Sequence, residues 1–244
     1  MQTVDVLIIG ATFCGAGIAC SSKKKVMIAE AGFVSGSEFA AGMNQKTPKT
    51  TVCKTIMGKK LEKMLRNKKL LNKTGELYAQ PAVFVLSALL CEQKANVRLN
   101  TLITGIQKTS DGCRVTLLNE DGQTEILAKQ IIDTTSTGVF CQFSRPKYLC
   151  TAVDKNGSVK NEITGMHYSV LPLDASCGWA EARERALREA EKCGQKIIMS
   201  ANNFVYRDEV LPKQTEYGLW MPSDGFYNLL AAFEGGADYA EQNL

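Results

Sequence analysis

The chain has 244 residues, long enough to bury a substantial core in one large domain or in one domain with a smaller one inserted. Its 45% hydrophobic and 22% charged residues are typical of a soluble globular protein, and no stretch approaches the roughly twenty apolar residues of a membrane span. The net charge of +4 is mild but unevenly distributed.

The number and spacing of the cysteine and histidine residues disfavour a metal site and a catalytic triad. Nine cysteines are scattered from Cys14 to Cys193 without a CxxC pair, and His167 is the only histidine. A zinc site needs clustered thiolate or imidazole ligands, so no metal site is predicted. We expect reduced thiols in a cytoplasmic protein, and a strand or surface histidine without chemistry.

Residues 4–30 predict a strand, a glycine turn, a helix and a second strand that ends in an acid. This order is that of a dinucleotide-binding βαβ unit. Gly10 would make the tight turn, Gly15 would let the helix pack close to the strand, and the helix N-terminus would face a pyrophosphate. Glu30 would accept hydrogen bonds from a ribose. Thr12 replaces the second glycine of a GxGxxG fingerprint, so the fingerprint is incomplete.

Two other interpretations of this segment compete with a nucleotide site. A buried strand followed by any helix with small residues would give a similar pattern. A secretory signal is disfavoured, because no Lys or Arg precedes the apolar run, Asp5 interrupts its start, and the basic residues 23–25 follow it.

Residues 31–80 begin as a glycine-containing loop at the ligand end of the predicted sheet, which favours a binding loop. Further along, basic residues predominate, with Glu62 as the single acid: Lys54, Lys59, Lys60, Lys63, Arg66, Lys68, Lys69 and Lys73. Such a run can bind phosphates or nucleic acid. Leu61, Met64 and Leu65 fall at helical spacing, however, and no aromatic residues interleave, so we predict a solvated helix face and no nucleic-acid partner.

The middle of the chain predicts a helix followed by a small antiparallel sheet. Pro81 opens an amphipathic helix at 83–93. Short strands are predicted at 97–100 and 103–108, and a hairpin joins 114–118 to 124–128 through a turn that ends at Gly122. A separate buried strand at 130–132 then ends at Asp133.

The remaining chain changes pattern after Val139. Short strands with a turn at 156–157 precede a charged amphipathic helix at about 179–193. The stretch 218–225 leads into a last helix, from about 226 to 242.

Four separated segments occur in the same order as in one protein family. On these segments the chain resembles the FAD-dependent oxidoreductases with a glutathione-reductase-like FAD fold, and most of all the broad bacterial group of FAD-dependent oxidoreductases. These segments are the βαβ unit, the strand at 97–103, the tetrapeptide Asp133-Thr134-Thr135-Ser136, and the segment 221–236. The tetrapeptide is similar to the family's aspartate-alanine-threonine-glycine signature, with Ser136 in place of the glycine.

The resemblance implies FAD as cofactor and a set of residues that contact it. The first unit would hold the pyrophosphate and the adenosine ribose, backbone atoms at Ile103 would contact adenine, and the last segment would bring an acid and a helix N-terminus to the ribityl chain and the flavin. The implied cofactor-binding residues are Gly10, Ala11, Thr12, Phe13, Cys14, Gly15, Glu30, Ala31, Ile103, Thr134, Thr135, Ser223, Asp224 and Asn228.

We therefore expect an α/β fold: a Rossmann-like FAD-binding domain whose parallel sheet carries an inserted antiparallel β-meander, plus a small α+β substrate or cap domain. The FAD domain would comprise 1–138 and 215–244, and the cap 139–214. Because the cap is near the lower size limit of a domain, we expect it to pack on the cofactor domain or on a second subunit, and a homodimer would complete the pocket.

The leading functional hypothesis is a flavoenzyme that transfers a hydride or electrons to or from an unidentified small molecule. No catalytic acid or base is assigned. The substrate would lie over the flavin, between the loop 35–44 and the cap, near Glu38, Asn44, His167 and Tyr168. No membrane partner is expected.

Two alternatives stay open. One is a non-catalytic dinucleotide-binding module with a regulatory or interaction role, favoured by Thr12, Ser136 and the small cap. The other is a protein that uses its bound dinucleotide as a reactant, in the manner of thiazole-forming enzymes, with Cys14 at the helix N-terminus as a thiol of lowered pKa. A buried small residue is the competing interpretation of Cys14.

Overall fold

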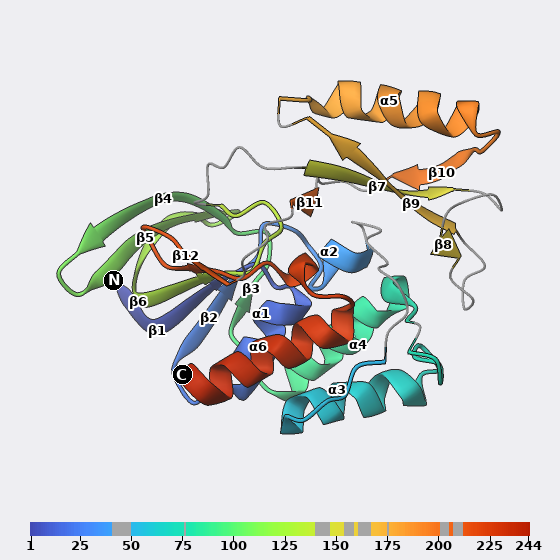
Figure 1. Ribbon diagram of the computed structural model, residues 1–244. Helices are drawn as coiled ribbons and strands as arrows, with labels where there is room; N and C mark the ends of the chain where they lie inside the picture. The colour runs from blue at the N-terminus through green and yellow to red at the C-terminus, as the bar shows by residue number, and fades with distance from the viewer. Residues whose placement is uncertain are drawn as a thin grey trace.

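The protein folds into two β-sheets with associated helices (Figure 1). The computed structural model describes residues 1–40, 50–75, 77–139, 147–153, 159–160, 167–174, 176–200, 205–206 and 212–244. This mixed α/β architecture is the fold class that the sequence predicts. Among the described residues, no helix combines the length and the apolar character that crossing a membrane requires.

The first sheet is built around the N-terminal strand. Its strand order is β12-β13-β6-β1-β2-β3. The strands β13, β6, β1, β2 and β3 pair in parallel, whereas β12 pairs antiparallel with β13. The bounds are β1 (Gln2–Ile9), β2 (Val26–Ala29), β3 (Val97–Arg98), β6 (Gly122–Asp133), β12 (Lys213–Gln214) and β13 (Leu219–Trp220). The carboxyl ends of β1, β2 and β6 therefore meet at one edge, where α/β sheets bind ligands.

An antiparallel meander continues from this sheet, as predicted. It consists of β4 (Leu102–Thr109), β5 (Gly112–Asn119) and the first half of β6. The prediction of two strands at 124–128 and 130–132 is wrong, because β6 is one continuous strand that pairs with β5 early and with β1 later. The strand predicted at 97–100 is shortened to Val97–Arg98, because Asn100 and Thr101 turn to hydrogen-bond the loop after β2.

Helices and the meander cover opposite faces of the parallel sheet. The helices are α1 (Phe13–Ser21), α2 (Ser37–Ala40), α3 (Ile56–Asn67), α4 (Ala79–Glu92), α6 (Leu229–Asn243) and the 3₁₀ turn η1 (Ser223–Gly225). On their side, Ile8 of β1 belongs to a core with Phe13, Leu86 and Phe233. On the other side, Leu7 packs in a core with residues of β5 and β6. The alternation along β1 places its side chains in two cores, as expected for a strand buried on both faces.

Helices α1 and α6 cross at very close range. A Cβ atom on Gly17 would collide with the carbonyl oxygen of Phe233, and one on Gly236 would collide with the carbonyl oxygen of Cys14. The backbones of the two helices thus touch where glycines remove the side chains. This contact fixes the C-terminal helix against the helix that starts at the first turn.

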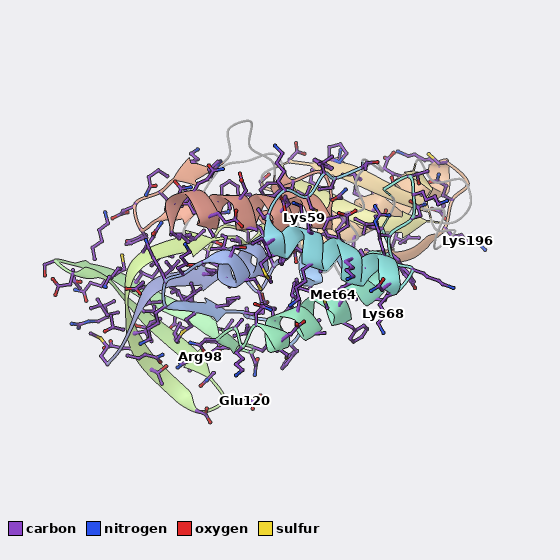
Figure 2. The ribbon with its side chains drawn as sticks, turned by 90° about the horizontal axis from the view of Figure 1, so that it is seen from below. Lys59, Met64, Lys68, Arg98, Glu120 and Lys196 are labelled. Carbon is purple, nitrogen blue, oxygen red and sulfur yellow. The ribbon has the colours of Figure 1, made fainter. Side chains whose placement is uncertain are left out.

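The basic segment forms the exposed face of α3, as predicted. Leu61 and Leu65 are fully buried, whereas Lys59 on α3 and Lys68 just after its last residue are exposed (Figure 2). Thr55 caps the helix by accepting a hydrogen bond from the backbone N–H of Gly58 over 2.9 Å. The helix is amphipathic in the ordinary sense, with a polar solvent face.

The second sheet is formed by residues that lie in the sequence between β6 and β12 of the first sheet. Its strand order is β10-β7-β9-β8, and β11 also pairs with β7. Helix α5 (Trp179–Lys192), predicted at this place, buries Ala182, Ala186 and Ala190 and lies along this sheet (Figure 1). The strands are β7 (Lys147–Val153), β8 (Val159–Lys160), β9 (His167–Leu173), β10 (Ile197–Ser200) and β11 (Val205–Tyr206). The turn predicted at 156–157 lies outside the described residues, and the domain boundaries stay a prediction.

Candidate functional site

The first turn has the geometry that the glycine fingerprint predicts. Gly10 follows β1 with a φ of +92°, and its backbone N–H donates to the carbonyl of Ala29 over 2.8 Å. A Cβ atom there would lie 2.9 Å from Cγ2 of Thr135 and 3.1 Å from Cγ2 of Thr12. Both the left-handed backbone and the lack of space therefore require glycine. Gly15 is also needed, because its Cβ would lie 2.9 Å from Oγ1 of Thr134.

Thr12 occupies the position of the missing second glycine and caps α1. Its Oγ1 accepts from the backbone N–H of Gly15 over 2.9 Å, and its hydroxyl donates to Oγ1 of Thr134 over 2.7 Å. The Thr134 hydroxyl lies 2.9 Å from the carbonyl oxygen of Ile9 and 3.1 Å from that of Gly10. The Thr12 side chain is thus used inside the protein, as an N-cap that ties the first turn to the end of β6.

We expect Thr134→Val to lower the free energy of unfolding by about 1–3 kcal/mol, since the hydroxyl is fully buried and its loss leaves buried partners unsatisfied. Valine has nearly the same shape, so packing changes little. Urea denaturation of the variant and of the wild type measures the difference. Thr124→Val, at an exposed position of β6, is the matched control, and an equal effect of both variants would contradict the role of the Thr134 hydroxyl.

Glu30 lies at the end of β2 and faces the first turn. Its Oε2 accepts from the backbone N–H of Ala11 over 2.7 Å, and its Oε1 accepts from the backbone N–H of Gly32 over 2.7 Å. The carboxylate is partly exposed and does not point away from the turn. It is therefore placed where a ribose acceptor is expected, next to Ala31, which has an exposed side chain.

The chain between β3 and β4 approaches Glu30 at Thr101. The backbone N–H of Thr101 donates to the carbonyl of Glu30 over 2.8 Å, whereas Ile103 lies further along, in β4. Ile103 instead lines a groove of about 740 Å³ together with residues of β4 and the segment around β12. An adenine contact at Ile103 stays a prediction.

A buried carboxylate lies at the N-terminus of α1. The backbone N–H of Phe13 donates to Oε1 of Glu38 over 2.8 Å, and the hydroxyl of Ser223 donates to the same oxygen over 2.6 Å. Ser223 in turn accepts from the backbone N–H of Cys14 over 3.1 Å. Because a helix N-terminus favours negative charge, Glu38 occupies the place that an anionic group of a ligand would take. The sequence places Glu38 near a substrate; the fold places it at the predicted pyrophosphate position.

Burial raises the pKa of Glu38 from 4.5 to about 7. Hydrogen bonds from Ser223 and from the backbone of Phe13 oppose this shift, while the negative charge of Glu30 adds to it. The second carboxyl oxygen, Oε2, is buried and has no hydrogen-bond partner among the described residues. The charged form is thus held at the helix N-terminus at a cost in desolvation.

This pKa predicts a pH-dependent stability. Between pH 4.5 and about 7 the folded protein keeps a proton on Glu38 that the unfolded chain has lost, so the free energy of unfolding falls as the pH rises through this window. The contribution is complete below the lower value, is lost above the upper one, and amounts to roughly 3 kcal/mol. Urea denaturation of wild type and Glu38→Gln at pH 5 and pH 8 measures it. Parallel pH profiles of the two proteins would contradict the shift.

The motif at the end of β6 forms its own hydrogen-bonded turn. Oδ1 of Asp133 accepts from the backbone N–H of Thr135 over 2.9 Å and from its hydroxyl over 2.6 Å, and Oδ2 accepts from the backbone N–H of Val139 over 2.6 Å. The indole of Trp220 donates to the carbonyl of Thr135 over 2.9 Å. Asp133 thus shapes the turn after the strand, and Ser136, at the position of the signature glycine, is partly exposed.

The C-terminal segment brings only part of its predicted residues to the first turn. Ser223 reaches it directly, and its backbone N–H donates to the carbonyl of Thr134 over 3.0 Å. Asp224 is buried in η1. Asn228 caps α6: its Oδ1 accepts from the backbone N–H of Ala231 over 2.8 Å and from the hydroxyl of Thr51 over 3.1 Å. The helix therefore begins at Leu229 rather than at 226.

The other predicted groups are partly placed. Cys14 is fully buried, and burial raises its pKa well above the ordinary value, which confirms the interpretation of Cys14 as a buried small residue over that of a thiol with lowered pKa. Asn44 lies outside the described residues, as do the side chains of His167 and Tyr168, whose backbones belong to β9. Within the described ranges, no three His, Cys, Asp or Glu side chains gather as a metal site, and no disulfide joins cysteines.

Comparison with known proteins identifies the fold. No protein-family model matches the sequence, and the search of curated proteins found no match. A geranylgeranyl bacteriochlorophyll reductase-like protein from Thermoplasma acidophilum superposes with a TM-score of 0.62 at 14% identity, over 99% of this chain and 78% of that one. A flavoprotein/dehydrogenase from Cytophaga hutchinsonii gives 0.54 at 15% identity, with the same coverages of 99% and 78%.

The anhydrotetracycline hydroxylase OxyS from Streptomyces rimosus gives a TM-score of 0.59 at 10% identity, over 99% of this chain. The chain spans only 62% of that enzyme's length. At these identities the likeness concerns the fold: the chain has the Rossmann-like α/β fold of FAD-binding flavoproteins.

Proposed function

We propose that this chain is an FAD-dependent oxidoreductase that acts on a small molecule. The observation that carries the proposal is the first turn. Gly10 and Gly15 bring the α1 N-terminus against the strand, the Glu30 carboxylate lies beside it, and the backbone N–H of Phe13 already donates to a carboxyl oxygen of Glu38. Folds of this kind in flavoproteins support the choice of FAD over other dinucleotides.

The donor set fits a dinucleotide in its chemistry. Glu30 would accept hydrogen bonds from the adenosine ribose, and the backbone N–H groups of Phe13 and Cys14 would donate to the diphosphate once Glu38 and Ser223 release them. Asp224, Thr134, Thr135 and the start of α6 are the groups we assign to the flavin end. When bound, FAD would supply hydride or electron transfer.

A non-catalytic, regulatory module is the second candidate, and one observation favours it. The N–H groups of Phe13, Cys14 and Gly15 all donate to side chains of the protein itself. A chain that has lost its nucleotide would be stabilised by such internal partners. The two candidates differ in whether the N–H groups at the α1 N-terminus exchange these internal partners for a ligand.

Titration of the purified chain with FAD tests the proposal. We expect one FAD per chain, seen as a heat of binding and as a change in flavin fluorescence, and reduction of the bound flavin by dithionite or by light. ADP, which shares the adenosine diphosphate, should compete. A chain that binds neither FAD nor ADP would overturn the proposal and favour the non-catalytic module. Bound NAD without flavin would favour use of the dinucleotide as a reactant.

A further inference from the structure

The α1 N-terminus is closed by a carboxylate of the same chain. Glu38 is half-buried as a residue, but its carboxyl oxygen Oε2 is buried, and its Oε1 lies 2.8 Å from the backbone nitrogen of Phe13. Ser223 links this oxygen to the backbone N–H of Cys14, so one carboxylate engages two successive donors of the helix. Oε2 is buried without a hydrogen-bond partner in the part of the chain that the structure describes.

The charges around Glu38 do not explain why a carboxylate should lie there. No described basic side chain forms an ion pair with it. Glu30 adds negative charge, Cys14 presents a thiol whose pKa is raised, and Asp224 is buried on η1, which packs against α2. The only charged residue of α4, which also packs against α2, is Glu92, and it pairs with Lys60. The helix N-terminus is thus the favourable partner of this carboxylate.

A diphosphate and this carboxylate cannot use the same donors. Each backbone N–H makes one strong hydrogen bond, and two anions within a few ångströms in a buried site repel each other. A dinucleotide that reaches the helix N-terminus must therefore displace Glu38. The apparent affinity for the dinucleotide is therefore the intrinsic affinity multiplied by the fraction of molecules in which Glu38 does not occupy these donors.

Resting on the proposed function, we propose that Glu38 is an affinity-determining residue of the dinucleotide site: its carboxylate stands in for the diphosphate in the free protein and competes with it for the α1 N-terminus. The ligand class is an adenine dinucleotide or diphosphate. Glu38→Gln keeps the size of the side chain and removes the competing charge, so the variant binds this class more tightly than the wild type.

The competition also gives a pH dependence with a defined sign. Protonation neutralises Glu38, weakens its hold on the helix N-terminus, and removes its repulsion of the diphosphate. Since burial raises the pKa of Glu38 to about 7, wild-type affinity falls as the pH rises from 5.5 to 8.5. The affinity of Glu38→Gln changes much less over the same interval.

Calorimetric titration of the full chain with FAD and with ADP tests this inference. We expect Glu38→Gln to bind both at least about tenfold more tightly than the wild type at pH 8, a factor that corresponds to a free protein closed in about nine molecules of ten. Glu125→Gln, at an exposed position of β6, is the control and should match the wild type. Circular dichroism verifies that each variant is folded.

The outcomes separate the inference from the proposed function. If wild type and Glu38→Gln bind FAD and ADP equally, with the same pH profile, the inference is overturned and the dinucleotide site stands. If no protein binds either ligand at any pH, both fail. Should Glu38→Gln not fold, the wild-type pH profile decides: affinity that falls with rising pH supports the competition, and constant affinity overturns it.

Discussion

Gly17→Ala is expected to lower the free energy of unfolding by at least about 3 kcal/mol, a large effect for a single methyl group. The added Cβ would collide with the carbonyl oxygen of Phe233 and would lie 3.0 Å from the backbone nitrogen of Ala237. Both atoms belong to the α6 backbone, so neither can rotate away. The two helices would have to separate, and the buried contacts around Phe233 would be lost. Chemical denaturation followed by circular dichroism measures the change.

Two further variants bracket this result. Gly236→Ala places a methyl group against the carbonyl of Cys14 in the same crossing and should be about as damaging. Gly105→Ala, on β4, meets Oγ1 of Thr116 at 3.5 Å and Cβ of Thr116 at 3.7 Å, which are ordinary contacts, and should be nearly neutral. If Gly17→Ala were as stable as Gly105→Ala, the close crossing of α1 and α6 would be wrong.

Glu30→Ala is expected to weaken FAD binding roughly 100-fold, the largest functional effect we predict. Hydrogen bonds to a charged acceptor contribute about 1.5–3 kcal/mol each, and a ribose offers two hydroxyls to this carboxylate. The variant also releases the backbone N–H groups of Ala11 and Gly32, which the carboxylate now holds over 2.7 Å each. The dissociation constant for FAD, from fluorescence titration, is the measurement.

The control for this variant must preserve the turn. Glu30→Gln keeps one carbonyl oxygen as an acceptor, so we expect an intermediate loss of affinity and a smaller loss of stability. Glu120→Ala removes an exposed carboxylate that bonds Asn100 and should leave FAD binding unchanged. Unchanged affinity in Glu30→Ala would remove Glu30 from the site.

The sequence predicts the fold well where local pattern and tertiary structure agree. The structure confirms the first strand, the glycine turn, the helix and the second strand that ends in an acid, because the local preferences of these residues are all compatible with one parallel pairing. It also confirms α3 and α5, whose apolar residues are spaced along one side of the helix. The break predicted within β6 is absent, because one strand can pair with β5 and β1 in turn. Local composition does not reveal such a change of partner.

The candidate site is harder to predict, since its key contacts join segments far apart in sequence. Thr12 reaches Thr134, and Ser223 links Glu38 to Cys14. The sequence identifies Glu38 as a polar group of the binding loop, but nothing local indicates that its carboxylate lies on the helix donors. One signal could have suggested this position, namely that Glu38 comes two positions after Gly36. Gly36 has a φ of +78°, and its backbone N–H donates to the carbonyl of Ala11 over 2.7 Å, which brings α2 against the first turn.

A crystal structure of the full chain with FAD tests the central claim most directly. The account predicts the diphosphate on the backbone N–H groups of Phe13 and Cys14, the adenosine ribose on Glu30, and the Glu38 carboxylate displaced from the 2.8 Å contact it makes without ligand. FAD bound elsewhere, or Glu38 still on Phe13 beside a bound dinucleotide, would contradict it.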